Sequence, residues 1–540
     1  MCGIVGYTGF RDAKSVVIDC LKRREYRGYD SAGIAVLDKK INIYKKVGEI
    51  SKIEKGVPNF KGKTAISHTR WATMGKVNEI NAHPHTDCNK NISIVHNGII
   101  ENYQKLREKL EKKGHKFLSN TDTEIIAHLI EEEHKKNKDF SKSFVKAVNK
   151  LEGSYAIVAM YKNQKDKLFV ARKESPIVVG IGDNENFVAS DIPALLKYTN
   201  RVIYIDDGEF CTIEPNKVEI YNDKKNPIKK KEKIINWNIK DAEKSGFPHF
   251  MLKEIFDQPE SVNQVFRGRI SEIERTIDFP ENVENLLDNN IESIHIVACG
   301  TSYYSGMIGK YFIEKLSKIP VKVEFSSEYR YFGTKNEKSL VIGITQSGET
   351  ADTLAALREA KSSGSRTLVI TNVIGSTATR ISDAYLLTQS GPEIGVAATK
   401  TFTSQVLLIF LTALKIAINK NKIGPSELYD YLIEIKELPR KLRNVLERTD
   451  EIKKIAKKIQ KSQSVFFIGR GINFPISLEG ALKLKEISYI HAEGFAAGEL
   501  KHGPFALLTK NTPVIAIATK DKTYDKIISN IGEVKARGPK

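Results

Sequence analysis

The first residues of the chain carry a candidate nucleophile. Met1 is followed by Cys2 and Gly3, and a methionine before a small residue is normally removed, which would leave Cys2 with a free thiol and a free α-amine. An α-amine titrates near pH ~7.7–8.0, so part of it is an unprotonated base at neutral pH. A thiolate is a strong nucleophile once a base has taken its proton. Cys2 alone is better explained as a small apolar residue, and only further motifs favour catalysis.

Those motifs are six, they are ordered along the chain, and they place polar groups at the ends of expected strands. They read CGIVG, RGYDSAG, HTRWAT, NAHPH, VHNGIIEN and TDTE. Over roughly residues 2–235 the chain thereby resembles the glutaminase domain of the class II glutamine amidotransferases. The resemblance implies an Ntn-hydrolase αββα sandwich that hydrolyses L-glutamine at Cys2, with the α-amine of that residue carrying the proton.

The resemblance also assigns roles to residues that bind glutamine and its transition state. Asn97 and the backbone N–H of Gly98 resemble the oxyanion hole, and a glycine leaves the approach to its amide open. Arg70 resembles the arginine that binds the α-carboxylate through two parallel hydrogen bonds. Asp122 would pair with the α-ammonium.

Two further contacts and two alternatives complete this site. Thr73 is a weaker candidate contact with glutamine, and Trp71 resembles the gate of an internal ammonia channel. Asp122 is also typical of the N-cap of a helix expected over 123–136. By itself, Arg70 would more often form a surface ion pair. Met74 stands where the family often has histidine, which puts a secondary substrate contact in doubt.

Metal chemistry is not expected from the sequence. The chain has no C-x-x-C pair and no HExxH motif, which argues against zinc. His68, His83, His85 and His96 have no acidic or thiolate partner at ligand spacing, so structural hydrogen bonding is the better interpretation. We expect no cofactor.

Two loops in the second half have the composition of phosphate sites. VACGTSYYSG (297–306) and GITQSGETADT (343–353) each follow an expected strand and begin an expected helix. Glycines and hydroxyls at a helix N-terminus bind phosphate through backbone amides and the helix dipole. Each loop alone is explained as well by helix capping. Two of them at successive strand ends of one parallel sheet favour a ligand site.

These loops resemble the sugar isomerase (SIS) fold, which binds phosphosugars. The resemblance implies side-chain contacts to a sugar phosphate from Thr301, Ser302, Thr345, Gln346, Ser347 and Thr350, and backbone contacts at Val396 and Ala397.

The segment LEGALKLKEISYIHAEGFAAGELKHGP (478–504) extends the resemblance to catalysis. Glu486 resembles the base that moves a proton between C2 and C1 of the sugar, and Lys483 would handle a sugar oxygen. His502 resembles the ring-opening acid–base, which the family places across a dimer interface. The alternative for Lys483 and Glu486 is a solvent-exposed i, i+3 ion pair.

The elements that must position these residues differ between the two halves. The first half is expected to contain many strands and few helices. We expect strands over 2–9, 31–38, 41–48, 64–73, 92–100, 155–161, 167–173, 177–182, 186–191, 201–213 and 217–222. We expect helices over 16–26, 101–113, 123–136 and 142–151. Two stacked sheets with helices outside fit this pattern.

The second half alternates strands and helices, as doubly wound parallel α/β domains do. Strands are expected over 294–298, 339–345, 366–371 and 383–387, and helices over 305–317, 351–361 and 400–419. A similar series restarts at 464–471 and 513, with a helix over 523–537, which predicts a duplicated domain whose second copy is incomplete. The expected division is a glutaminase domain (2–222), a lysine-rich linker (223–246), a first SIS domain (247–425) and a truncated second SIS domain (426–540).

Composition sets the broad class. The 540 residues carry a net charge of +19 and five widely spaced cysteines, an odd number that predicts a reducing cytoplasm rather than disulfides. No run of about 18 apolar residues was expected to span a membrane. The basic residues are scattered, so we expect phosphorylated metabolites rather than nucleic acid as partners, and a homodimer.

Together these resemblances imply transfer of nitrogen from L-glutamine to fructose 6-phosphate, an entry step of amino-sugar synthesis. An amidotransferase for nucleotides or asparagine would need a phosphoribosyltransferase or ATP-pyrophosphatase loop. A sugar-sensing regulator would need a DNA-binding helix-turn-helix instead of Cys2 and Asn97. Since no segment matches the family's imine-forming lysine tail before Lys540, a glutaminase-competent but synthase-impaired fragment is the alternative.

Overall fold

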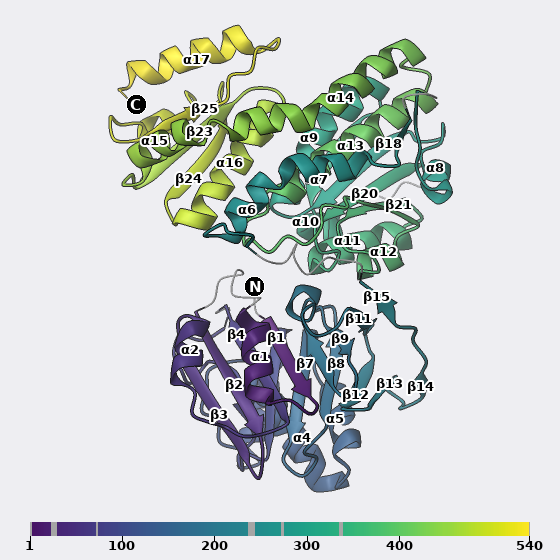
Figure 1. The fold of residues 1–540 in the computed structure, drawn as a ribbon, viewed down its shortest axis with the longest axis vertical. Helices are drawn as coiled ribbons and strands as arrows, with labels where there is room; N and C mark the ends of the chain where they lie inside the picture. The colour runs from purple at the N-terminus through teal and green to yellow at the C-terminus, as the bar shows by residue number, and fades with distance from the viewer. Residues whose placement is uncertain are drawn as a thin grey trace. The chain divides into compact units, whose positions relative to one another are not determined.

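A computed structural model describes residues 3–22, 30–71, 74–235, 244–271, 275–333 and 338–538. The chain divides into two compact units, Met1–Glu243 and Lys244–Lys540 (Figure 1). Each unit is described by itself.

The first unit contains two antiparallel sheets (Figure 1). One sheet has the order β15 (Lys233–Ile234), β11 (Arg201–Tyr204), β9 (Val178–Ile181), β10 (Asn186–Ala189), β1 (Gly3–Thr8), β4 (Thr64–Arg70), β2 (Ser31–Leu37) and β3 (Ile41–Val47). The other has the order β14 (Pro227–Ile228), β13 (Lys217–Tyr221), β12 (Phe210–Glu214), β8 (Leu168–Lys173), β7 (Gly153–Tyr161), β6 (Ile92–Ile100) and β5 (His85–Thr86).

Alternating apolar residues pack the two sheets face to face. Ile4 and Ile66 of the first sheet share a buried cluster with Val95, Val158 and Val170 of the second. Helices α1 (Ala13–Lys22) and α2 (Ile50–Gly56) pack on the first sheet. Helices α3 (Tyr103–Glu111), α4 (Glu124–Asn137) and α5 (Phe140–Val148) pack on the second through a separate buried cluster. The expected αββα sandwich is confirmed.

Two expectations for this unit differ from the structure. The single strand expected over 201–213 is two strands, one in each sheet, joined by a turn in which Gly208 has a φ of +79° and Asp206 N–H donates to the Glu209 carboxylate at 2.6 Å. The lysine-rich stretch expected as a linker over 223–246 contributes β14, which pairs with β13, and β15, which pairs with β11. Strands of two residues are too short to leave a periodic pattern.

The second unit begins with helical segments and a small hairpin. These are α6 (Phe250–Phe256), α7 (Gln258–Phe266), β16 (Ile270–Ser271), β17 (Thr276–Ile277) and α8 (Glu281–Leu286). A parallel sheet follows, with the order β19 (Val321–Phe325), β18 (Ser293–Ala298), β20 (Ser339–Thr345), β21 (Arg366–Thr371) and β22 (Ala384–Leu387). Its helices are α9 (Thr301–Ser317), α10 (Ser326–Phe332), α11 (Ala351–Ser362), α12 (Thr377–Ile381) and α13 (Lys400–Asn419).

A second parallel sheet follows the helices α14 (Pro425–Leu446) and α15 (Thr449–Ile459). Its order is β24 (His491–Ala496), β23 (Ser464–Gly469) and β25 (Val514–Ala516), with α16 (Asn473–Ser488) and α17 (Tyr524–Ala536). This order repeats β19–β18–β20, and each strand starts about as far after its counterpart as the others do. The repeated order supports the predicted duplication. Sequence reasoning missed β19 and β24, because VKVEF and HAEGFA are partly exposed edge strands without an apolar run.

Helix α13 corrects one expectation about membranes. By length and composition its 20 residues are apolar enough to cross a membrane, with a mean hydropathy of 1.8 over an 18-residue window. However, 67% of that window is buried within the unit, where α13 packs against α9 and α7. The apolar composition of α13 is therefore explained by its place in the core.

Candidate active sites

The first unit brings together the start of β1 and the end of β4. Gly3 pairs with Thr69 and Ile4 pairs with His68, so the end of β4 that carries Arg70 and Trp71 lies beside the beginning of the chain. Cys2 and Thr73 lie outside the described residues. The side chain of Trp71 is partly exposed, and its expected role as a gate remains a prediction.

His68 holds the side chain of Asn97. The two residues lie on different sheets, and His68 Nε2 is 2.9 Å from Asn97 Oδ1. Because a carboxamide oxygen only accepts, His68 Nε2–H is the donor. Burial lowers the pKa of His68 to about 3, so the ring is neutral at physiological pH and keeps this donor. With Oδ1 engaged, the Nδ2 amide is the end of Asn97 that can donate to a substrate oxygen.

The remaining buried histidines lie behind His68 and are hydrogen-bonded, as expected. His83 stacks on His68 with ring centroids 4.0 Å apart and accepts the backbone N–H of His96 at 3.4 Å. His96 Nδ1 is 2.9 Å from Thr123 Oγ1, and His85 Nε2 is 3.3 Å from a neighbouring threonine hydroxyl. Burial lowers the pKa of each ring. The layer is therefore neutral, and it supports the strand ends without adding charge.

Gly98 occupies a position that excludes any side chain. Its φ is +128°, and a Cβ there would lie 2.0 Å from the carbonyl oxygen of Ser154. Gly98 pairs with Tyr155 near the end of β6, where residues 98 and 99 are exposed while the preceding six are buried. The backbone at Gly98 is therefore open to a ligand at the point where the Asn97 amide is positioned.

Arg70 and Asp122 place opposite charges in this unit, and both are buried. The guanidinium of Arg70 donates to the carbonyl oxygens of Met74 and of Gly75, the latter at 3.1 Å. The surface ion pair considered for Arg70 is therefore wrong. Asp122 Oδ2 accepts the N–H of Ile100 at 2.9 Å. Thr123 is the N-cap of α4, so Asp122 ties the entry to that helix to the end of β6 rather than capping it.

In the second unit, the parallel pairing of β18 with β20 places their following loops at one edge of the sheet. After β20, the Thr345 and Thr350 hydroxyls are 2.9 Å apart, and Gly348 N–H donates to Thr345 Oγ1 at 3.3 Å. Ser347 Oγ accepts the N–H of Glu349 at 3.2 Å, and the backbone carbonyl of Gln346 accepts the N–H of Asn372 at 3.0 Å. The hydroxyl-rich loop is thus folded around the start of α11.

The loop after β18 begins α9 four residues earlier than the sequence predicts. Gly300 is the N-cap and has a φ of +55°, a conformation that glycine adopts without steric cost. Ser302 is buried, and its hydroxyl accepts from Gln405 Nε2 at 3.1 Å. Thr301 points instead toward helix α16.

Thr301 joins the two α/β copies at a cluster of charged residues on α16. Lys483 Nζ lies 2.7 Å from Glu486 Oε2 and donates to Thr301 Oγ1 at 2.9 Å. Thr301 Oγ1 in turn donates to Glu479 Oε1 at 3.1 Å. The Lys483 and Glu486 side chains are 18% and 33% exposed, so this is not a freely solvated ion pair. The structure brings a predicted sugar-phosphate contact together with both predicted catalytic residues.

Glu479 was missed by sequence reasoning. It is buried, and burial is the largest of the effects that raise its pKa to about 7. Its Oε2 is buried and makes no hydrogen bond to the described residues. The signal in the sequence is its spacing of four from Lys483 and seven from Glu486, which places all three on one helix face.

We expect the unfolding midpoint of the wild type, relative to that of Glu479→Gln, to fall as pH rises. Between the ordinary value of 4.5 and the raised value of about 7, the folded chain holds a proton at Glu479 that the unfolded chain has released. Stability is then fully present below the lower value and is lost on the way to the higher one. Thermal unfolding of both proteins across this window measures the difference, and a pH-independent difference would contradict the raised pKa.

Two buried glutamates hold the loop that contains Val396 and Ala397. Glu254 accepts the backbone N–H groups of Ile394 and Gly395, the latter at 2.9 Å. Glu393 Oε1 accepts the N–H of Thr399 at 2.8 Å. Val396 is exposed and Ala397 is buried, so the loop is fixed with an exposed turn, and its contact with a sugar remains a prediction.

His502 is not brought to this cluster within the described part of the chain. It lies in an exposed turn after β24, where its backbone N–H donates to the Glu499 carbonyl at 2.9 Å. No hydrogen bond joins its side chain to the described Thr301, Lys483 or Glu486. Its expected place across a dimer interface remains a prediction.

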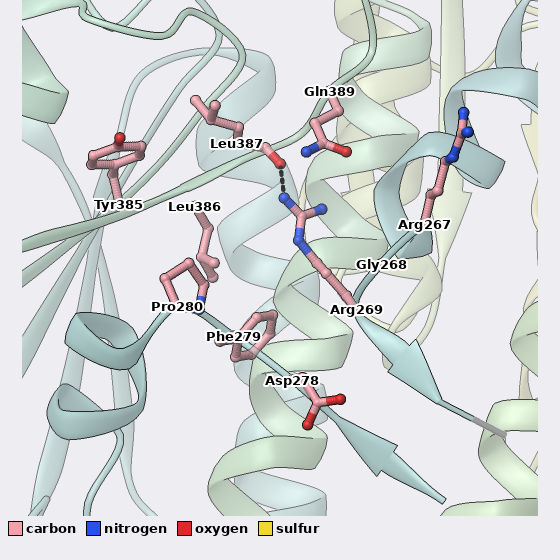
Figure 2. Close-up of a pocket in the computed structure, with 10 residues that line it drawn as sticks. All are labelled: Arg267, Gly268, Arg269, Asp278, Phe279, Pro280, Tyr385, Leu386, Leu387 and Gln389. Atoms are coloured by element: carbon pink, nitrogen blue, oxygen red, sulfur yellow. Dashed lines mark hydrogen bonds between the residues drawn. The ribbon is translucent and has the colours of Figure 1, made fainter. Parts of the chain in front are cut away.

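A separate cavity of about 410 Å³ lies at the edge strand β22 (Figure 2). Arg269 crosses it and donates to the Leu387 carbonyl, as the dashed line in Figure 2 shows. Asp278, Phe279 and Tyr385 also line it. None of the predicted sugar-phosphate residues does, so this cavity is distinct from the loops after β18 and β20.

Comparisons with known proteins agree with the division into two chemistries. A glutamine amidotransferase domain model matches residues 68–197, and a SIS domain model matches residues 289–415 and 458–540. Among solved structures, the C-terminal domain of glucosamine-fructose-6-phosphate aminotransferase from Francisella tularensis is 43% identical, with a TM-score of 0.54, and covers 55% of this chain and 84% of that one.

Curated relatives match along almost all of this chain. A glutamine–fructose-6-phosphate aminotransferase [isomerizing] of Methanosarcina acetivorans is 48% identical over 551 residues, covering 99% of this chain and 89% of the relative. The corresponding proteins of Aquifex aeolicus and Thermococcus kodakarensis are each 47% identical. They cover 99% and 100% of this chain, and 88% and 89% of the relatives.

Proposed function

The chain belongs to the family of glutamine–fructose-6-phosphate aminotransferases (isomerizing), and from this premise we propose how its residues carry out the reaction. The enzyme converts L-glutamine and D-fructose 6-phosphate to L-glutamate and D-glucosamine 6-phosphate. The observation that carries this conclusion is the match to relatives of 47–48% identity over 99–100% of the chain. Since both halves match, the alternative of a glutaminase-only fragment is not favoured.

In the first unit, Cys2 attacks the side-chain amide of glutamine while its α-amine accepts the thiol proton. The new C–S bond makes a tetrahedral intermediate whose oxyanion accepts from Asn97 Nδ2 and Gly98 N–H. Collapse releases ammonia, which takes the proton from the α-amine, and leaves a thioester. Water then hydrolyses the thioester to glutamate and regenerates the thiol. The hydrogen bond from neutral His68 to Asn97 Oδ1 supports this assignment, because it directs the amide N–H₂ outward.

Arg70 and Asp122 bind the two charged ends of glutamine in this proposal. The guanidinium takes the α-carboxylate and the aspartate takes the α-ammonium. Both side chains are buried, so these ion pairs form away from water, where they are stronger. The present partners of Arg70 are loop carbonyls at 74 and 75, which a carboxylate would displace or share. Thr73 adds a weaker contact, and Trp71 gates the passage of ammonia.

In the second unit, the loops after β18 and β20 hold the phosphate. The proposed contacts are Thr301, Ser302, Thr345, Gln346, Ser347 and Thr350, with the backbone at Val396 and Ala397. His502, from across a dimer interface, opens the sugar ring. Ammonia adds to the C2 carbonyl and water leaves. Glu486 then removes a proton from C1 and returns it to C2, while Lys483 stabilises a sugar oxygen.

The finer assignments complete the proposal. We place the glutaminase at 2–222 and the two SIS domains at 247–425 and 426–540. The active form is a cytoplasmic homodimer that binds small metabolites and neither nucleic acid nor membrane. Five widely spaced cysteines and a scattered basic charge support this assignment.

The test is to incubate the purified chain with glutamine, with and without fructose 6-phosphate, and to assay glutamate and glucosamine 6-phosphate separately. We expect both products in equal amounts when the sugar is present. Glutamate without amino sugar would contradict the synthase assignment and would leave only the glutaminase. Absence of both products would contradict the function of Cys2 as well.

A further inference from the structure

Four potential metal ligands converge in the first unit, away from Asn97 and Gly98. Cys88 follows β5, His115 follows α3, and His128 and Glu131 lie three residues apart on α4. Cys88 Sγ is 3.6 Å from His115 Nδ1 and 3.5 Å from His128 Nδ1. The two Nδ1 atoms are 3.3 Å apart, and Glu131 Oε2 lies 3.2 Å from one and 3.6 Å from the other.

The separations between these atoms fit one tetrahedral cation. Zinc binds thiolate sulfur at about 2.3 Å, imidazole nitrogen at about 2.0–2.1 Å and carboxylate oxygen at about 2.0–2.2 Å, so tetrahedral ligand atoms stand about 3.3–3.6 Å from one another. The five distances given above span 3.2–3.6 Å. They come from residues on three segments of chain, so no helical repeat or turn geometry imposes them.

The second polar atom of each ligand is directed to another partner. His115 Nε2 lies 3.4 Å from Glu132 Oε2, and His128 Nε2 lies 3.6 Å from Glu124 Oε1. Glu131 Oε1 accepts from Asn89 at 3.2 Å and lies 3.1 Å from Lys135 Nζ. A carboxylate beside the outer nitrogen of a histidine fixes the tautomer that leaves the inner nitrogen as a ligand.

This arrangement leaves too few protons at the centre. With both histidines protonated at Nε2, their Nδ1 lone pairs face each other and the Glu131 carboxylate oxygen. Only the Cys88 thiol has a proton to share among these acceptors. Lone pairs that converge in this way repel unless a cation lies between them.

We propose that Cys88, His115, His128 and Glu131 form a structural zinc site. Zinc suits a mixed sulfur, nitrogen and oxygen set in tetrahedral geometry, and four protein ligands leave no open position for catalysis. The three histidine and glutamate ligands are buried whereas Cys88 is exposed, so the ion would enter from the surface. Binding releases the thiol proton of Cys88 to water.

The site would fasten three segments beside the proposed glutaminase centre. It joins the turn after β5 and the segment after α3 to helix α4, which Asp122 immediately precedes. Zinc would therefore hold the helix whose entry carries the proposed ligand for the glutamine α-ammonium. Sequence reasoning missed the site because the ligands lie far apart along the chain, and only His128 and Glu131 have a local spacing.

Elemental analysis of the whole chain tests the proposal. After purification with zinc in the growth medium and dialysis, we expect about one zinc per chain, and a lower unfolding midpoint after chelation that zinc restores. In the chelated protein, cobalt(II) should give a sulfur-to-cobalt charge-transfer band and tetrahedral d–d bands. Absence of zinc together with absence of those bands would overturn the proposal.

A double variant, Cys88→Ser with His128→Asn, removes two ligands and should lose the zinc and the charge-transfer band. The matched control is Cys299→Ser, a cysteine outside the cluster, which should retain both. Zinc retained by the double variant would overturn the assignment of ligands. If the double variant does not fold, the cobalt spectrum of the unmodified chain decides, because it reports thiolate and imidazole ligation directly.

Discussion

Asn97→Asp should lower kcat for glutamine hydrolysis by about 100- to 1,000-fold, or about 2.7–4 kcal/mol of transition-state stabilisation. The new side chain has the shape of the old one, and one oxygen still accepts from His68 Nε2 at the position of Oδ1. The other oxygen replaces the N–H₂ donor and faces the oxyanion with a lone pair. KM for glutamine should change little, because Arg70 and Asp122 are untouched. Glutamate release by the purified variant measures both parameters.

The control for this variant is Asn163→Ala, which removes an exposed amide that donates to the Tyr161 hydroxyl. It should leave kcat unchanged, since surface substitutions of this kind alter stability by only about 0.5 kcal/mol. Unchanged hydrolysis in Asn97→Asp would show that the carboxamide does not stabilise the oxyanion. A rise in KM at constant kcat would instead assign Asn97 to ground-state binding.

Glu486→Gln should reduce glucosamine 6-phosphate formation by about 100- to 10,000-fold, the usual contribution of a general acid–base. Glutamine keeps the size of the side chain and an oxygen that accepts from Lys483, but it cannot take a proton from carbon. Glutamate release should persist, because Glu486 belongs to the other unit. Assaying the two products in parallel separates loss of sugar chemistry from general damage.

The matched control is Glu437→Gln on the exposed face of α14, where the carboxylate pairs with Arg440. Such a surface pair contributes about 0–1 kcal/mol, so both products should form at the wild-type rate. Full amino-sugar formation by Glu486→Gln would exclude it as the base. Glu479, which shares the helix face and has a raised pKa, would then become the first candidate.

Sequence motifs located most of the first site, because its chemistry is concentrated at strand ends. Asn97 and Gly98 are adjacent in sequence, and the need for glycine at 98 follows from a positive φ that the structure shows. The role of His68 was not predictable, since it depends on two sheets packing so that residues 68 and 97 meet. The αββα layers followed from alternating patterns, whereas the two-residue strands β14 and β15 leave no such pattern.

The second site was predicted as two loops and one helix, and contacts between them were not foreseen. Thr301 looked like a phosphate ligand on the basis of its loop, but its hydroxyl meets Glu479 and Lys483. A glutamate on a helix is ordinarily exposed, so only tertiary packing reveals that Glu479 is buried. The zinc ligands escaped notice for a related reason, because three segments must fold together before they face one another.

The hydrogen bonds from Thr301 in one α/β copy to Glu479 and Lys483 in the other have an evolutionary consequence. After a gene doubles a segment, the daughters ordinarily drift apart on their own. Here a hydroxyl, a carboxyl and an amine depend on one another across the pair, so a change in one must suit the other two. The daughters are bound to a shared inheritance, and neither can be shed or transplanted as an autonomous sugar-binding module.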